Sequence, residues 1–269
     1  MSNRLRNLAT ENERVATTGV YTTSTGVRVS IGSALAAARS GTVSCSPAFT
    51  PAPTGHFTGE VEVTDEDSMH AARRLTGEGV EHLAVLNFAS ARNPGGGYLR
   101  GAKAQEEDLC RTALLYQCLL EAPDYYAAHR ASADLNYSHR VIFSPHVPVI
   151  RDASRALLDQ PYQVSFLTSP APNAGQLALH SPGEEVDVRG TLAERARRVL
   201  GVAAHHGVRE LVLGAWGCGV FGNDPAEVAD AFAEALNAHG APFVRITFAV
   251  WDRSADSPNR AAFRARFAS

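Results

Sequence analysis

The sequence has few cysteines and no cysteine motif. The four are scattered without a CxxC pair, at Cys45, Cys110, Cys118 and Cys218. This spacing indicates neither a zinc knuckle nor a disulfide framework. We therefore expect reduced thiols, as in a cytoplasmic protein.

Long apolar runs and an excess of basic residues are also lacking. The N-terminus opens into polar sequence without the apolar stretch of a signal peptide, and no run approaches the length of a membrane span. The net charge is −3 at pH 7, whereas proteins that coat nucleic acid or membrane surfaces need a basic field. We expect a cytoplasmic monomer that binds neither DNA nor membranes.

The chain does have enough apolar residues for a large core. It contains 269 residues, 45% of them hydrophobic and 20% charged, without a composition break that would mark a linker. We expect one structural unit, with a core over residues 59–269 and an N-terminal extension over residues 1–58 packed on it. The extension carries no motif, and we expect a helix over 3–15, a hairpin over 20–31 and a short helix over 31–40.

Strand and helix patterns alternate through the core. We expect strands near 60–64, 82–88, 141–149, 163–168, 209–213 and 243–250, and helices near 65–77, 105–121, 190–206 and 225–239. Thr64 is the expected N-cap of the first of these helices, with Asp67 closing a capping box. This alternation is typical of an α/β layered domain.

Three consecutive glycines interrupt the second of these strand-helix units. Gly95, Gly96 and Gly97 follow the apolar strand over 82–88. Glycine permits positive φ and lets backbone N–H groups approach a ligand, so this loop can cradle an anion such as a phosphate. A flexible surface turn is the alternative, and the glycines alone do not decide between the two.

An acidic helix start follows the glycines. Glu106, Glu107 and Asp108 lie in the expected first turn, where acids commonly complement the helix dipole. Adjacent side chains on a helix point about 100° apart, so Glu106 and Glu107 are badly placed to flank one glycosidic carbon, as the usual carboxylate pair of a glycosidase does. If they serve catalysis, one acid acts on the bond and the other holds the substrate.

The triple glycine, a seven-residue spacer and Gln105-Glu106-Glu107 resemble the signature of the poly(ADP-ribose) glycohydrolases, in their compact bacterial-type branch. This resemblance implies a macrodomain-like mixed sheet flanked by helices, which holds ADP-ribose. It implies that Glu107 is the catalytic acid/base and that Glu106 holds ribose hydroxyls. It also places Gln105 and Gly95–Gly97 among the substrate-binding residues, and we assign the family's ribose-binding asparagine to Asn93.

A second glycine-rich stretch follows the strand over 209–213. Gly217, Gly219 and Gly222 precede a helix that begins with Asp224-Pro225, so N–H groups can face a second anion and the two loops could grip a diphosphate. The spacing also fits a dinucleotide-binding fingerprint, but that fingerprint should open the first βαβ unit of a chain.

The same stretch resembles the diphosphate-binding loop of the glycohydrolase family. The resemblance implies that its residues bind substrate, namely Gly217, Cys218, Gly219, Val220, Phe221 and Asn223. Phe221 is expected to pack on the distal ribose. Cys218 has no recognisable His-Asp partners for a nucleophile, which favours an inert small residue.

By this resemblance we expect hydrolysis of the ribose-ribose O-glycosidic bonds of poly(ADP-ribose), which releases ADP-ribose through an oxocarbenium-like transition state. We expect no metal or organic cofactor, and we associate the activity with the DNA damage response. Two alternatives remain. One is a non-catalytic ADP-ribose reader, and the other is a hydrolase that removes single ADP-ribose groups from proteins.

Overall fold

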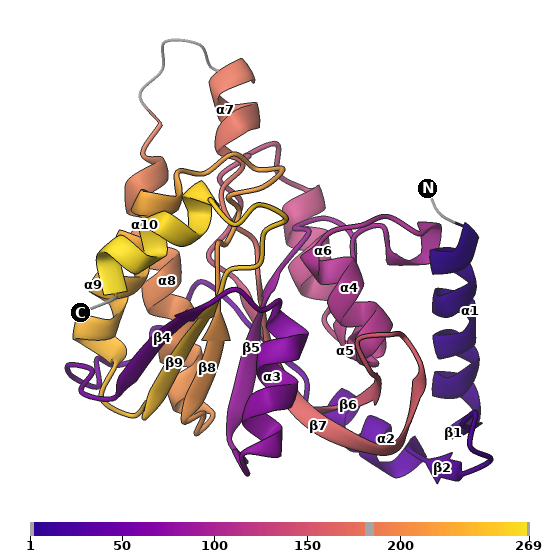
Figure 1. Cartoon of the computed structure of the whole chain (residues 1–269). Coiled ribbons are helices and arrows are strands. Elements are labelled where there is room, and N and C mark those ends of the chain that lie inside the picture. The colour runs from indigo at the N-terminus through magenta and orange to yellow at the C-terminus, as the bar shows by residue number, and fades with distance from the viewer. Residues whose placement is uncertain (1–2, 181–185, 268–269) are drawn as a thin grey trace.

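One mixed β-sheet runs through the described residues, 3–180 and 186–267, of the computed structural model (Figure 1). Its strands lie in the order β3-β6-β7-β5-β8-β9-β4, and β5 is therefore central. β5 pairs in parallel with β7 and β8, and β9 pairs in parallel with β8 and β4, whereas β6 pairs antiparallel with both of its neighbours, β7 and β3. The strands are β3 (Val43–Cys45), β4 (Glu60–Thr64), β5 (Leu83–Phe88), β6 (Val141–Arg151), β7 (Leu157–Ser169), β8 (Glu210–Leu213) and β9 (Arg245–Ala249).

Helices cover both faces of this sheet (Figure 1). On one side lie α1 (Asn3–Thr18), α2 (Gly32–Ser40), α3 (Ser68–Gly77), α4 (Gln105–Thr112), α5 (Leu115–Leu119) and α6 (Pro123–Arg130). On the other lie α8 (Val188–His205), α9 (Pro225–His239) and α10 (Pro258–Phe267). The remaining elements are a small hairpin of β1 (Val20–Thr22) and β2 (Arg28–Ser30), a short 3₁₀ helix, η1 (Tyr98–Arg100), and α7 (Ala174–His180).

The two apolar cores follow from the alternation of side chains along the strands. In β5, Leu83 and Val85 join the core under α3 and α4, whereas Ala84 and Leu86 join the core under α8 and α9. Successive strand residues point to opposite faces, so a strand covered on both faces is apolar throughout. Across the described ranges, no helix is long and apolar enough to cross a membrane.

The sheet departs from the sequence prediction at its edge. We expected its first strand at Glu60, but β3 forms the edge strand by antiparallel pairing with β6, from Val43↔Phe143 to Cys45↔Val141. Three residues are too few to show an alternating pattern. This pairing therefore depends on contacts distant in sequence.

Two helix predictions were also wrong in detail. The helix expected over 105–121 is divided into α4 and α5, because Leu114 donates its N–H to Pro148 O at 3.0 Å instead of continuing the helix. α3 begins at Ser68, and its N-cap is Asp67 rather than Thr64. The Asp67 carboxylate accepts two backbone N–H groups of the first turn, each at 2.9 Å.

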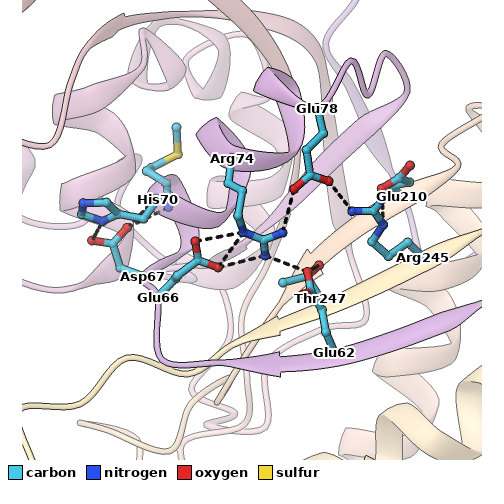
Figure 2. Close-up of polar contacts among 10 residues, drawn as sticks. Glu62, Glu66, Asp67, His70, Arg74, Glu78, Glu210, Arg245 and Thr247 are labelled. Carbon is cyan, nitrogen blue, oxygen red and sulfur yellow. Dashed lines mark hydrogen bonds and ion pairs between the residues drawn. The ribbon is translucent and has the colours of Figure 1, made fainter.

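A network of ion pairs ties α3 to the strands (Figure 2). The guanidinium of Arg74 contacts Glu62 of β4 at 2.7 Å and Glu66 at 2.9 Å. Glu78 contacts Arg74 at 3.3 Å and Arg245 of β9 at 2.7 Å. Each pair is partly exposed and is screened by solvent, so the network orients α3 more than it stabilises the fold.

Arg195 of α8 is fully buried and holds two loops together. Its guanidinium donates to Pro170 O at 2.7 Å, Asn136 O at 2.6 Å and Tyr137 O at 3.2 Å. Burial lowers its pKa to about 10, which leaves it charged at neutral pH. The loop after β7 is thereby joined to the loop after α6.

Replacing Arg195 by Met should lower the free energy of unfolding by about 3 kcal/mol or more, because buried carbonyls lose their donors. Urea denaturation measures the change. Arg197→Met is the matched control, since Arg197 lies on the same helix, is more exposed and pairs with the Glu194 side chain instead of buried carbonyls. Equal stability of the two variants would contradict the assignment.

Candidate active site

The two glycine-rich loops start from neighbouring strands, at the same end of the sheet. They follow β5 and β8, which are neighbouring parallel strands, so both loops leave from the carboxyl ends where ligands gather in α/β sheets. The loops begin close together, because a Cβ built on Gly214 would lie 3.1 Å from the ring of Phe88. We call Gly95–Gly97 the triglycine loop and residues 214–223 the second glycine loop.

The triglycine loop lies directly against the acids of α4. Gly95 and Gly96 have φ of +63° and +56°. Gly97 donates its N–H to Glu107 Oε1 at 2.7 Å, and a Cβ on Gly96 would lie 2.6 Å from the same oxygen. Both the left-handed backbone and the close approach therefore require glycine here. Asn93 is exposed, and its carbonyl accepts the Gly96 N–H at 3.0 Å.

Glu107 is buried and keeps one oxygen free. Only 7% of the residue is exposed. Oε1 accepts the Gly97 N–H, whereas Oε2 has no hydrogen-bond partner among the residues that the structure describes. A buried carboxylate with an unpaired oxygen is costly unless a ligand uses it, which makes Oε2 the candidate atom for proton transfer.

Glu106 has both oxygens occupied. Oε2 accepts the backbone N–H of Ser90 at 2.7 Å, and Oε1 accepts from Asn87 Nδ2 at 3.3 Å. Burial raises the pKa of Glu106 to about 8, although these two hydrogen bonds oppose the shift. Glu106 is therefore mostly protonated at neutral pH, and the adjacent acids do not present two full charges.

The third acid of the helix start is engaged elsewhere. Asp108 pairs with Arg155, which also donates to Thr112 Oγ1 at 2.7 Å. The carboxylate of Asp108 therefore serves a structural ion pair and is not grouped with the other two carboxylates. Within residues 3–180 and 186–267, no three His, Cys, Asp or Glu side chains are grouped as metal ligands.

Gln105 locks the start of α4 to the central strand. Its Oε1 accepts the Phe88 N–H at 2.9 Å, while its Nε2 donates to Leu86 O at 2.8 Å and to Ser68 Oγ at 3.1 Å. Both N–H groups of this amide are thus used within the protein. The side chain holds the acids over the end of β5.

The second glycine loop is closed by Asn223. Its Nδ2 donates to Pro172 O at 2.9 Å and to Gly217 O at 3.1 Å, so it joins this loop to the loop after β7. Gly217 and Gly222 have φ of +74° and +68°, which turn the chain back on itself. Asp224 then caps α9 by accepting a first-turn N–H at 2.8 Å.

The middle of the second glycine loop is open. Val220 is 93% exposed, and a Cβ on Gly219 would meet nothing within 4 Å. Phe221 is half-buried, with its ring centroid 6.1 Å from that of Tyr137. Burial raises the pKa of Cys218 to about 12, so its thiol is not a nucleophile at neutral pH.

The family described as microbial-type PARG, catalytic domain, matches residues 9–152, where PARG stands for poly(ADP-ribose) glycohydrolase. The chain belongs to this family. Poly(ADP-ribose) glycohydrolase from Thermomonospora curvata, bound to the inhibitor ADP-HPD, is 44% identical over 99% of this chain and 100% of its own, with a TM-score of 0.88. The Deinococcus radiodurans enzyme in complex with ADP-ribose is 47% identical over 87% of this chain and 97% of its own, with a TM-score of 0.79.

No curated protein matches the chain. The structural matches confirm the fold class expected from the sequence, a macrodomain-like mixed sheet flanked by helices. They also place the chain in the glycohydrolase family that the triple glycine and the Gln-Glu-Glu motif resemble.

Sequence reasoning missed the residues that orient the acids of this glycohydrolase-family chain. Asn87 is fully buried and donates to both Glu106 and Thr168 Oγ1, the latter at 3.1 Å. A signal existed, since Asn87 is the polar residue in an otherwise apolar strand. Ser90 acts through its backbone, and its contact with Glu106 left no mark on the sequence.

The raised pKa of Glu106 predicts a pH-dependent stability. Between pH 4.5 and about 8 the unfolded chain releases this proton while the folded chain keeps it, so the folded state loses stability as pH rises. Glu106→Gln cannot ionise. The melting temperature of the variant minus that of the wild type should therefore increase by a few degrees from pH 5 to pH 8. Thermal melts at several pH values check this.

Glu81→Gln is the control, because Glu81 is exposed on the loop before β5. Its melting temperature should follow the wild type at every pH. A Glu106→Gln variant that also follows the wild type would contradict the raised pKa.

Proposed function

We propose that this protein hydrolyses the ribose-ribose O-glycosidic bonds of poly(ADP-ribose) and releases ADP-ribose. Membership of the glycohydrolase family supports this activity. The observation that carries the proposal is the state of Glu107. One of its oxygens is held by the Gly97 N–H, and the other is buried without a partner in the described structure.

Glu107 acts first as an acid and then as a base. A sugar oxygen is a poor leaving group, so Oε2 protonates the glycosidic oxygen as an oxocarbenium-like ribose forms. The resulting carboxylate then takes a proton from water, which adds to the sugar carbon. The Gly97 N–H holds Oε1 in place through both steps, so that Oε2 carries the proton transfers.

Glu106 orients the substrate in this proposal. Asn87 and Ser90 hold its carboxyl group in place, and its raised pKa keeps it largely neutral beside Glu107. A neutral acid can donate to a ribose hydroxyl as well as accept from it. Asn93 is proposed to bind ribose from the start of the triglycine loop.

The second glycine loop is proposed to bind the diphosphate. Its backbone N–H groups at Gly217, Gly219 and Val220 face the phosphates in this proposal, near the N-terminus of α9. The Gly96 and Gly97 N–H groups are engaged by Asn93 O and Glu107, so we assign the triglycine loop to a close approach of its backbone to the ligand. Phe221 is proposed to pack on the distal ribose. Gln105 and Asn223, expected from the sequence to contact substrate, have their amide N–H groups engaged within the protein, so we assign them to holding the site in shape.

We further propose that the enzyme works in the cytoplasm, as a monomer, in the DNA damage response, without metal, organic cofactor, DNA or membrane. The four cysteines, which the structure shows as free thiols, support a reducing compartment. We retain the division into a core over 59–269 and an N-terminal extension over 1–58 as a proposal.

Two rivals can be separated from this function in one assay. A reader of ADP-ribose needs the loops but has no use for a buried carboxylate with a free oxygen. A mono-ADP-ribosyl hydrolase would release ADP-ribose from modified protein but leave the polymer intact. Incubation of the purified protein with labelled polymer, with and without EDTA, should give EDTA-resistant release of ADP-ribose. Unchanged polymer would rule out the proposed function, and release that EDTA abolishes would rule out its metal independence.

Replacing Glu107 by Gln should reduce turnover of the polymer by about 100-fold or more, because the amide cannot transfer a proton. The variant should still bind ADP-ribose, since the loops are intact. Rate measurements together with calorimetry check both parts. Near-normal turnover would remove the acid/base role from Glu107.

Gly219→Leu should fold normally and bind ADP-ribose at least about tenfold more weakly, because a Cβ there meets no protein atom within 4 Å, whereas the added side chain blocks the approach of a phosphate. Gly77→Leu is the matched control, since a side chain there also meets open space, at the end of α3. Unchanged affinity of Gly219→Leu by calorimetry would remove the diphosphate from this loop.

A further inference from the structure

α1 caps the far end of the helix that carries the acids. Asn12 of α1 is fully buried, and its Nδ2 donates to Arg111 O at 2.9 Å and to Cys110 O at 3.3 Å. These carbonyls belong to the last turn of α4, where helix geometry leaves them without partners along the chain. A residue from the N-terminal helix thus supplies hydrogen bonds that the last turn of α4 lacks.

The orientation of Asn12 is itself held by β6. Its Oδ1 accepts from Arg151 Nε at 2.8 Å, and Arg151 Nη2 donates to Glu11 Oε2 at 2.6 Å. Arg151 is buried, so its charge requires these partners. Two successive residues of α1, Glu11 and Asn12, therefore join this helix to Arg151 of β6.

The next residue of α1 contacts the residue that follows the triglycine loop. Glu13 accepts from the hydroxyl of Tyr98 at 3.3 Å and from Gln117 Nε2 at 2.6 Å. Tyr98 directly follows Gly97, is buried, and also donates to Ala9 O at 3.3 Å. The side chain that follows the critical Gly97 N–H is therefore bound to α1.

These segments need external support. α4 has eight residues, and isolated helices of that length are unstable in water. The triglycine loop has high backbone entropy in the unfolded chain. The loop and the helix nevertheless place Gly97 N and Glu107 Oε1 2.7 Å apart.

We propose that Asn12 and Glu13 are positioning residues for the reaction. α1 holds the segment that carries Glu107, residues 98–112, at both of its ends: at Tyr98 and at the C-terminus of α4 (Figure 1). This inference rests on the proposed glycohydrolase function. Misplacement of a catalytic group by about 1 Å can cost 100-fold in rate, so loss of either contact reduces turnover more than it reduces affinity.

The test uses Glu13→Ala and Tyr98→Phe in the full chain, with poly(ADP-ribose) as substrate. Both variants should lower kcat by about tenfold or more while the Kd for ADP-ribose changes less than about threefold. Tyr98→Phe removes only the hydroxyl, so it also covers the case in which Glu13→Ala folds poorly. Glu13→Gln should restore most of the kcat, because its amide oxygen still accepts from Tyr98.

Two controls on the same helix separate positioning from stability. Val15→Ala creates a cavity in the core and should lower the melting temperature at least as much as Glu13→Ala, with kcat within about twofold of the wild type. Arg14→Ala changes an exposed neighbour and should alter neither the melting temperature nor kcat. If Val15→Ala lost as much kcat as Glu13→Ala, or if Tyr98→Phe kept the wild-type kcat, the positioning role would be wrong.

Amide hydrogen exchange gives a readout that does not depend on activity. Glu13→Ala and Tyr98→Phe should speed exchange over residues 95–100, including the Gly97 N–H, whereas Val15→Ala should not. Unchanged exchange would overturn the inference even in a protein without activity. Wild-type protein that leaves the polymer intact would instead contradict the proposed function, and the exchange data would still decide whether α1 holds the loop.

Discussion

The hydrogen bond from the Gly97 N–H to Glu107 is the constraint on which the rest of the site depends. It fixes one carboxylate oxygen and leaves the other free. For this bond to form, Gly96 must lack a side chain, because a Cβ there would lie 2.6 Å from the same oxygen. The start of α4 must also lie over the end of β5, and the amide of Gln105 holds it there.

Two chemically identical neighbours, both buried, have different hydrogen-bond partners. Glu106 accepts two hydrogen bonds, yet burial still raises its pKa to about 8. Glu107 faces the triglycine loop and keeps an oxygen without a partner in the described structure. The difference between the two acids therefore follows from what each one contacts, since both occupy the first turn of one helix.

The sheet brings this pair to the second glycine loop. Parallel pairing of β5 and β8 sends both loops from the same edge, and Asn223 joins the second loop to the loop after β7. Arg195 joins that loop in turn to residues 136 and 137. The strands thus carry two glycine-rich segments, distant in sequence, to the same end of the sheet.

The sequence by itself determined what depends on neighbouring residues. Most strands and helices of the core, the two glycine loops, the acidic start of α4 and the glycohydrolase family could be read from it, because dihedral preferences and short motifs are local. Only the tertiary structure decided which acid has a free oxygen, that β3 closes the sheet edge, and that Asn12 caps α4 across 99 residues of chain. These contacts join groups that are far apart in the sequence. A buried polar group needs a hydrogen-bond partner, and only the fold decides which distant group lies near enough to be that partner.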